Sequence, residues 1–430
     1  MISSMYTAVS GLNAEDTQLS VIGNNIANQN TVGFKNSRAL FGDVLSSEMA
    51  GMQVGSGVRV DDITSQFTQG SLETTSNALD MAIEGNGFFV VNGSSGERFT
   101  RAGQFSMDKS GNIVDPQGDV LQGYQADANG NITGTTGNLQ LTVSQLPPQE
   151  TSSASMKLNL QSTAKVYDPT TAPFSLTGGA GGTPTNYDYS TSVDAYDVQG
   201  IDHKVTAYFT NVGASADGVS GDTDWKANYV YNDTAGNPTI AGTQTLTFNS
   251  SGALVSDNND SPIAFNFATS QNIAFDYGTA INAPESGTGL DGTTQFASDF
   301  AVENVTQNGS PAGTLENYGI DKNGVITGTF TNGQQKTLGQ IVLANFDSPT
   351  SLQQLDGNLY TQTVDSGQAL IGKPQTAGLG SVNSGSLEES NVDLSDQFVK
   401  MIAAQSGYEA NSKMITTMDQ LMQTLVNMKQ

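Results

Sequence analysis

The residues that could carry enzyme chemistry are few in this chain. It contains one histidine, His203, and no cysteine, so thiolate nucleophiles, disulfides, Cys-based metal sites and multi-histidine metal sites are ruled out. His203 lies in the alternating segment IDHKVTAYF, and we interpret it as a cross-strand or surface residue rather than a general base. No phosphate-binding loop, dinucleotide-binding fingerprint or nucleophile elbow is present in a suitable context.

Carboxylates are the remaining source of chemistry, since the chain has 42 Asp and Glu residues against 16 Lys and Arg. A carboxylate pair of the glycosidase type is an open alternative, but most of these groups lie in turn-like or helix-surface contexts and none is singled out. The net charge of −26 argues against nucleic acid and anionic membrane surfaces, which both require clusters of basic residues. We expect a protein that is not an enzyme, with no cofactor, no membrane insertion and no cleaved signal peptide.

One short pattern recurs three times, as FSMDKSGNIV at 105–114, YQADANGNIT at 124–133 and YGIDKNGVIT at 318–327. In the second copy Asp127, Asn129 and Asn131 alternate as they do in a calcium loop. The glycine, however, is at the fourth position instead of the sixth, and no closing Glu follows. We therefore predict three β-hairpins, in which Asp opens the turn and Gly supplies a positive φ.

Amphipathic helices are predicted at both ends of the chain, where apolar residues recur every three or four positions in a narrow seam typical of coiled coils. The N-terminal seam consists of Ile2, Met5, Val9, Leu12, Leu19, Ile22 and Ile26, and the C-terminal seam of Leu394, Phe398, Met401, Ala404, Tyr408, Ile415, Met418, Met422 and Leu425. The N-terminal segment is rich in Gly, Ser, Thr and Val, so its stability must come from packing. It packs either on the rest of the same chain or on other copies, and the sequence leaves both open.

Between these helices the sequence is typical of a β-rich protein, with 48 glycines and recurrent Tyr and Phe. GFFVV at 87–91 predicts a strand buried on both faces. The composition changes after LPPQETSSAS at 146–155, and hairpin-like sequence returns near residue 318. This order predicts one β domain that is split by a second, inserted β domain.

The first residues, MYTAVSGLNAEDTQLSVIGNNIANQNTVGFK, resemble the start of bacterial flagellar rod and hook proteins. The signature of that family, Ala-Asn-x-x-Thr-x-Gly-Phe-Lys, corresponds to Ala27, Asn28, Thr31, Gly33, Phe34 and Lys35. Blocks at 69–91, 99–124 and 384–427 are similar to the same family. One departure is Gln405-Ser406-Gly407-Tyr408, which lacks the Arg that usually follows the Gln and gains a helix-weakening Gly.

The resemblance implies a structural subunit. Segment 150–290 resembles the outer domain of hook proteins, which favours a hook subunit over the shorter distal rod subunit, the nearest alternative. Hook proteins form a curved tubular polymer that joins motor to filament as a universal joint. The implied partners are further copies of the chain, the distal rod and hook–filament junction proteins, the hook cap and the type III export apparatus, which delivers the subunit outside the cell. Phe41 and Leu45 fit the family's export-gate element, although Phe41 could instead be a packing residue.

Residues and resemblance together predict a mainly β fold with terminal α-helices that pair as a coiled-coil layer. The expected parts are a terminal helical domain (1–30 and 388–430), an extended linker region (31–75 and 371–387), a split middle β domain (76–147 and 291–370) and an inserted outer β domain (148–290). A secreted adhesin or carbohydrate-binding module is an alternative from another class. We rank this alternative last, together with a glycosidase, because neither class of protein explains an apolar seam at each end of the chain.

Overall fold

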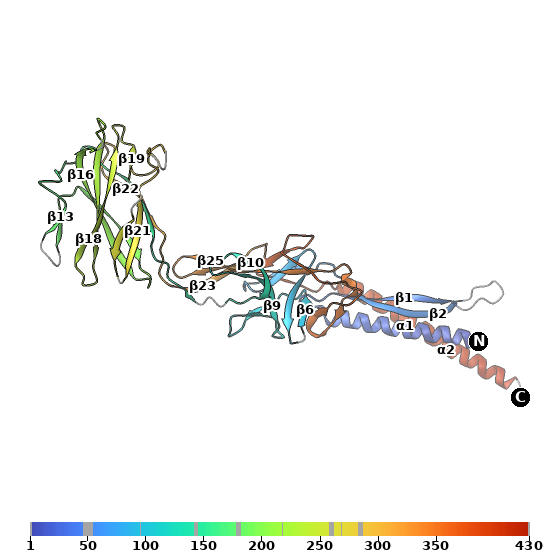
Figure 1. The fold of residues 1–430 in the computed structure, drawn as a ribbon. Helices are drawn as coiled ribbons and strands as arrows, with labels where there is room; N and C mark the ends of the chain where they lie inside the picture. The colour runs from blue at the N-terminus through green and yellow to red at the C-terminus, as the bar shows by residue number, and fades with distance from the viewer. Residues whose placement is uncertain are drawn as a thin grey trace. The chain divides into compact units, whose positions relative to one another are not determined.

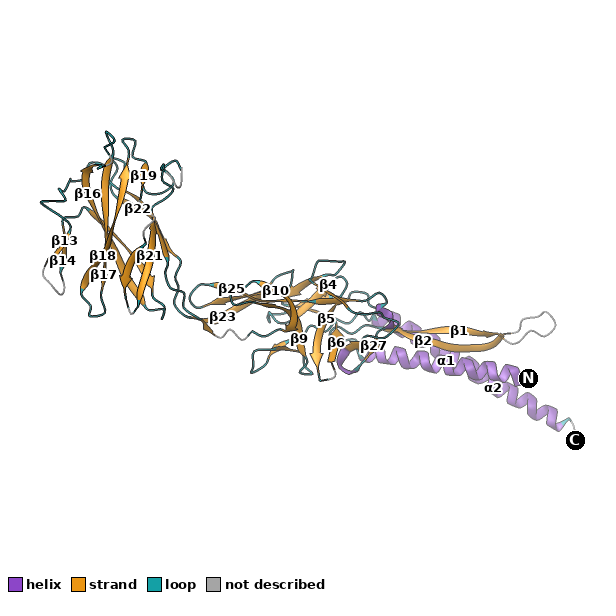
Figure 2. Cartoon of the chain, viewed as in Figure 1, coloured by secondary structure: helices purple, strands orange, loops and turns teal. Residues whose placement is uncertain are grey.

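The computed structural model describes residues 2–45, 55–94, 96–141, 145–177, 182–216, 218–257, 262–267, 269–282 and 287–428. The chain folds into two compact units, one formed by Met1–Ser144, Glu316–Thr329 and Gln335–Gln430, the other by Gln145–Leu315 and Phe330–Gln334. Strands dominate the described residues, with one α-helix near each end (Figures 1 and 2). The predicted mainly β fold with terminal helices that pack together is confirmed.

Helix α1 (Ile2–Ala27) and helix α2 (Leu394–Asn427) lie side by side in the first unit (Figure 1). Asn25 of α1 bonds to Gln397 near the start of α2, whereas Gly11 faces Asn411 further along, so the two helices run antiparallel. The Asp393 carboxylate caps α2 by accepting hydrogen bonds from the backbone N–H groups of Ser395 and Asp396.

A long hairpin follows α1 in the region that the sequence predicted as an extended linker. Strands β1 (Ser37–Leu45) and β2 (Gly55–Ser65) pair antiparallel and lie along α1 (Figure 2). The backbone of β2 approaches α1 closely at Gly57, where φ is +110° and the Ser10 hydroxyl accepts a hydrogen bond from Val58 N–H. A side chain at position 57 would collide with Ser10, so glycine is required for this contact.

The β part of the first unit is built around β5 (Phe88–Gly93), in which Phe88 to Val91 are buried as predicted and Asn92 is exposed. Phe89 and Val91 contribute to one apolar cluster, and Phe88 and Val90 to another, because successive side chains point to opposite faces of the strand. The other strands are β3 (Leu72–Thr74), β4 (Met81–Glu84), β6 (Gly96–Thr100), β7 (Ser106–Met107), β8 (Ile113–Val114), β9 (Val120–Ala126), β10 (Ile132–Asn138), β23 (Gly313–Ile320), β24 (Val325–Phe330), β25 (Gln335–Ile341), β26 (Leu343–Asn345), β27 (Gln353–Gln354), β28 (Leu359–Thr361), β29 (Leu370–Gly372), β30 (Ser381–Ser384) and β31 (Ser386–Glu388), with short 3₁₀ turns at Pro349–Ser351 and Asp356–Asn358.

The three predicted hairpins are confirmed as β7–β8, β9–β10 and β23–β24. In each turn the aspartate, Asp108, Asp127 or Asp321, accepts hydrogen bonds from the backbone N–H groups two and four residues later. Hydrogen bonds hold the pKa of two of these carboxyls below its usual value: chiefly the backbone N–H of Asn131 for Asp127, and chiefly the side chain of Asn112 for Asp108. The repeated aspartate is thus a turn-forming residue.

The second unit is a β-sandwich. One sheet has the order β15-β16-β17-β18-β19 and the other β20-β21-β12-β22, and both contribute to one core that includes Trp225 and Phe275. Its strands are β11 (Gln145–Leu146), β12 (Ser153–Asn159), β13 (Ser175–Thr177), β14 (Thr183–Thr185), β15 (Tyr189–Tyr196), β16 (Asp202–Ala214), β17 (Thr223–Asn232), β18 (Pro238–Phe248), β19 (Leu254–Ser256), β20 (Ile263–Asn266), β21 (Ser270–Asp276) and β22 (Ala301–Gln307). Because β22 pairs with β12, this unit extends past residue 290, the boundary expected from the sequence.

Candidate functional site

Small residues lie where the two terminal helices approach each other closely. Ala8, Ala14 and Ala404 are buried, and glycines bring the backbones close at two points. Gly11 faces the Asn411 amide, and Gly407 faces the Glu15 carboxylate. The glycine at 407, one of the departures from the family pattern, therefore makes room for Glu15. Burial raises the pKa of Glu15.

The predicted seam residues divide into those that are covered within the chain and those that remain exposed. Ile22 and Ala404 are buried, and Leu12, Leu19, Ile26, Leu394, Met401, Ile415 and Met418 are half-buried. Met5, Val9, Phe398, Tyr408 and Met422 remain 38–50% exposed. Ile2 and Leu425 lie in the helices, but their side chains fall outside the described residues. Packing within one chain therefore covers only part of each seam.

The register of the helices carries the end of α2 past the end of α1. With Asn25 opposite Gln397 and Gly11 opposite Asn411, the first residue of α1, Ile2, lies opposite Gln420. The last two turns of α2 therefore extend past α1, as Figure 1 shows. We call this segment, residues 421–427, the α2 overhang. Its Leu421, Met422 and Val426 are 49%, 45% and 63% exposed.

A second apolar group of α2 points away from α1. Phe398, Val399 and Ile402 lie together near the start of the helix and are 50%, 67% and 63% exposed. The sequence periodicity identified Phe398 but missed Val399 and Ile402, because these two lie outside the seam that faces α1. Apolar side chains gathered on an exposed face mark an association surface.

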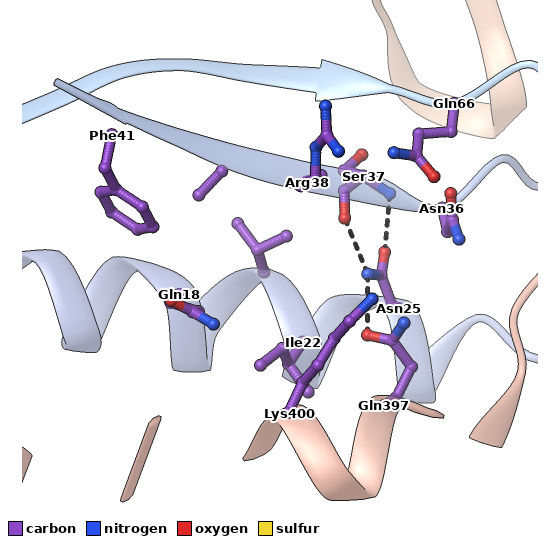
Figure 3. A pocket seen from close by; sticks show the side chains of 12 residues that line it. Gln18, Ile22, Asn25, Asn36, Ser37, Arg38, Phe41, Gln66, Gln397 and Lys400 are labelled. Atoms are coloured by element: carbon purple, nitrogen blue, oxygen red, sulfur yellow. Dashed lines mark hydrogen bonds between the residues drawn. The ribbon is translucent and has the colours of Figure 1, made fainter. Parts of the chain in front are cut away.

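The connector after α1 is anchored by a buried asparagine (Figure 3). The Asn25 amide donates to the Ser37 carbonyl (2.9 Å) and to Gln397 Oε1 (3.2 Å), and its Oδ1 accepts from Ser37 N–H (2.9 Å). These bonds join α1, β1 and α2 beside a cavity of about 290 Å³. Phe41 lines this cavity and is 38% exposed, whereas the Leu45 side chain is outside the described residues.

The family-signature residues form a turn that docks on the β part of the same unit. Ala27 ends α1, and Asn28 accepts a hydrogen bond from the Thr31 hydroxyl. Gly33 has a φ of +69° and donates its N–H to the Glu388 carbonyl at 2.7 Å. Phe34 is 2% exposed. The motif is therefore a fixed connector in this chain.

Lys35 ends the motif in a fully buried charge cluster. Its Nζ lies 2.6 Å from Glu388 Oε1 and donates to the Thr68 carbonyl at 2.8 Å, and both charged side chains are 0% exposed. Arg101 Nη1 lies 3.6 Å from Glu388 Oε2. Burial lowers the pKa of Lys35 and of Arg101, and Glu388 partly offsets both shifts. Sequence reasoning found Lys35 but missed Arg101 and Glu388.

These features are those of a structural protein with exposed apolar side chains on its terminal helices. No group of three or more His, Cys, Asp or Glu within the described ranges is arranged to hold a metal ion. The described helices include none long and apolar enough to cross a bilayer. The two terminal helices form a pair that carries exposed apolar side chains. A buried connector fixes this pair to the β part of the same unit.

Comparison with known proteins places the chain in a family of this class. It matches the descriptions "Flagella basal body rod protein" over residues 5–35, "Flagellar hook protein FlgE/F/G D1 domain" over 82–156, "Flagellar basal body protein FlaE D2 domain" over 159–310 and "Flagellar basal body rod FlgEFG protein C-terminal" over 383–428. The chain belongs to the flagellar hook protein FlgE family. Its predicted membership of the flagellar rod and hook proteins is confirmed.

Individual relatives match along their whole length. The chain is 39% identical to the flagellar hook protein FlgE of Escherichia coli strain K12, covering 98% of this chain and 99% of the relative. It is 32% identical to the FlgE of Borreliella burgdorferi, with 100% of both chains covered. The crystal structure of the Helicobacter pylori flagellar hook protein FlgE2 aligns with a TM-score of 0.53 at 15% identity, covering 74% of this chain and 100% of that one, which shows a shared fold.

Proposed function

We propose that copies of this chain assemble into a curved tubular helical polymer, the flagellar hook, which acts as a flexible universal joint between rod and filament. In this polymer the terminal helices form the innermost layer and the inserted β domain lies outermost. Membership of the hook protein family and the exposed apolar side chains of the helix pair support this proposal. The distal rod subunit, the nearest alternative, is not favoured, because the relatives that match along the whole chain are hook proteins.

The assembly partners follow from the same proposal. The subunit would be exported by the flagellar type III apparatus without cleavage, assembled beneath the hook cap, and joined to the distal rod at one end and to the hook–filament junction proteins at the other. Phe41 and Leu45 remain a candidate export-gate element. In the folded chain Phe41 lines the cavity between β1 and α1, so an export role would belong to the unfolded chain.

The single observation that carries the proposal is the α2 overhang. Its apolar side chains continue the helical seam where α1 has ended, so they are available to a second copy of the chain. Burying the exposed half of Leu421 and Met422 would contribute about 1 kcal/mol each. That gain opposes the mutual repulsion of subunits that each carry a net charge of −26. A contact between unlike surfaces that does not close into a ring generates an open filament.

Polymerisation of overhang variants tests the proposal. Leu421→Ser with Met422→Ser should raise the critical concentration for polymer formation about tenfold or more, since 1.4 kcal/mol corresponds to one factor of ten. The matched control is Gln420→Ser, an exposed polar position one residue earlier on the same helix, which should assemble like the unmodified chain. Sedimentation measures the critical concentration, electron microscopy shows the polymer, and circular dichroism checks that the monomer helices persist. Assembly of the double variant at the unmodified critical concentration would contradict the proposal.

A further inference from the structure

A second surface of interest lies on the β-sandwich unit. A half-open cavity of about 190 Å³ lies between the segment 167–174, which leads into β13, and strands β16, β17 and β18. Its described lining comprises Tyr167, Pro169, Ala172, Pro173, Phe174, Thr210, Val212, Lys226, Asn228 and Thr243. At about 30 Å³ per water it has room for roughly six waters, which is the scale of one sugar ring.

The floor of the cavity is the outer face of the sandwich sheet. Trp225, Ala227 and Tyr229 of β17 point into the core, so the alternating residues Lys226 and Asn228 point the other way. In the sheet register Lys226 is opposite Thr210, and Asn228 is opposite Thr243. An outer face of this kind would normally be solvated, but the covering segment leaves Asn228 only 5% exposed.

The Asn228 side chain is bonded through both of its polar atoms, but its donor side only weakly: its Oδ1 accepts a hydrogen bond from the Thr243 hydroxyl at 2.9 Å. The Asn228 amide nitrogen has three acceptors, all at 3.4–3.5 Å, which is long for N–H···O bonds. Lys226 takes part in none of the ion pairs formed by the described residues, although the chain carries 42 acidic side chains. None of the described lining residues is acidic. A buried amide donor and a cation therefore face one space without a counter-charge.

The walls of the cavity are apolar and rigid. Phe174 stacks on Tyr208 with ring centroids 5.5 Å apart, which fixes the covering segment against β16. Tyr167 and two prolines complete the apolar lining. A cavity with apolar aromatic walls and a few convergent polar groups is the usual form of a small-molecule site.

From this arrangement we propose that the cavity binds an acidic monosaccharide of the uronic acid class. The carboxylate pairs with Lys226, ring hydroxyls bond to the Asn228 amide and to the threonine hydroxyls, and the apolar face of the ring lies against the aromatic wall. The volume of the cavity matches one ring, and Lys226, the one cation among its described lining residues, selects an acidic sugar over a neutral one. The site shares no residue with the helix pair, so sugar binding and polymer formation can be tested separately.

Saturation-transfer NMR and calorimetry on the full chain test this inference with four probes: glucuronate, galacturonate, glucose and acetate. We expect saturable binding of at least one uronate at millimolar concentration. Glucose and acetate should each bind at least about tenfold more weakly, because glucose lacks the carboxylate and acetate lacks the sugar ring. Lys226→Met should weaken uronate binding about tenfold, and Lys226→Arg should retain most of it. The matched control is Lys204→Met, an exposed lysine of the neighbouring strand β16, which should bind as the unmodified chain does.

Three results would overturn the inference. They are equal binding of glucose and glucuronate, unchanged uronate binding by Lys226→Met, and the lack of saturable binding of either uronate. A folding check on Lys226→Met uses the fluorescence of Trp225, the adjacent core residue and the only tryptophan in the sequence, which should match that of the unmodified chain.

Discussion

Because Lys35, Glu388 and Arg101 form a buried cluster, replacing one charged side chain of the cluster by an uncharged one should destabilise the connector. Glu388→Gln would leave two cations in the interior without a counter-charge, because both side chains that face Glu388 are positive and nearly unexposed. Removing one partner of a buried pair costs about 3–5 kcal/mol. Lys35→Met should cost less, since Arg101 and the Gly70 N–H still face the Glu388 carboxylate.

An exposed ion pair provides the matched control. Arg59 and Asp61 are also in contact, at 2.7 Å, but their side chains are 71% and 41% exposed. Arg59→Met should therefore change the free energy of unfolding by no more than about 1 kcal/mol. The contrast between the two pairs separates the effect of burial from the effect of contact alone.

Denaturant unfolding measured by two signals is the appropriate assay. Helical circular dichroism reports mainly on the first unit, whereas the fluorescence of Trp225 reports on the sandwich unit. Glu388→Gln should shift the first transition by about 3–5 kcal/mol and leave the second unchanged. Hydrogen exchange should also quicken at Gly33, whose N–H is bonded to the Glu388 carbonyl. A shift below about 1 kcal/mol, equal to that of the exposed pair, would refute the reasoning.

Three further substitutions test the helix pair and the connector. Gly407→Ala should stabilise α2 by up to about 1 kcal/mol, because the added Cβ meets only the flexible end of Glu15, and thermal unfolding of the monomer measures the gain. Gly33→Ala should instead destabilise the first unit by about 1–3 kcal/mol, since φ is +69° and the Cβ would lie 2.5 Å from the Ala102 backbone nitrogen; an unchanged unfolding midpoint would contradict this. The raised pKa of Glu15 means that the folded state holds its proton more tightly, so the associated stability is fully present below the ordinary Glu pKa and is lost as the pH rises through the raised value. Glu15→Gln should remove this pH dependence and raise the free energy of unfolding at neutral pH by less than about 1 kcal/mol, because the carboxylate is only partly buried; a pH profile like that of the unmodified chain would count against it.

Local sequence signals predicted the elements that depend on local chemistry. The helices follow from three-and-four spacing, the hairpins from an aspartate followed three residues later by glycine, and the burial of β5 from its run of aromatic and branched residues. The family resemblance supplied the pairing of the terminal helices. Each of these depends on residues that are close in the sequence or on a motif that can be read directly.

The remaining features depend on contacts between distant residues. Lys35 and Glu388 are 353 positions apart, and no periodicity links them. The β1–β2 hairpin is half-exposed and follows no clear alternation, so the sequence suggested only an extended linker. The division of the seams into covered and uncovered parts depends on the helix register, which glycines and one buried asparagine determine.

Thiol labelling at position 422 tests most directly whether another copy covers the α2 overhang. The chain contains no cysteine, so Met422→Cys introduces a single reactive group on a side chain that is 45% exposed in the isolated subunit. A second variant, Thr234→Cys, places the same group in an exposed turn of the sandwich unit as a control. Labelling at 422 should be rapid in the monomer and at least about tenfold slower in the assembled polymer, while the control labels at the same rate in both. Equal labelling at 422 before and after assembly would show that the overhang is not where copies of this chain meet.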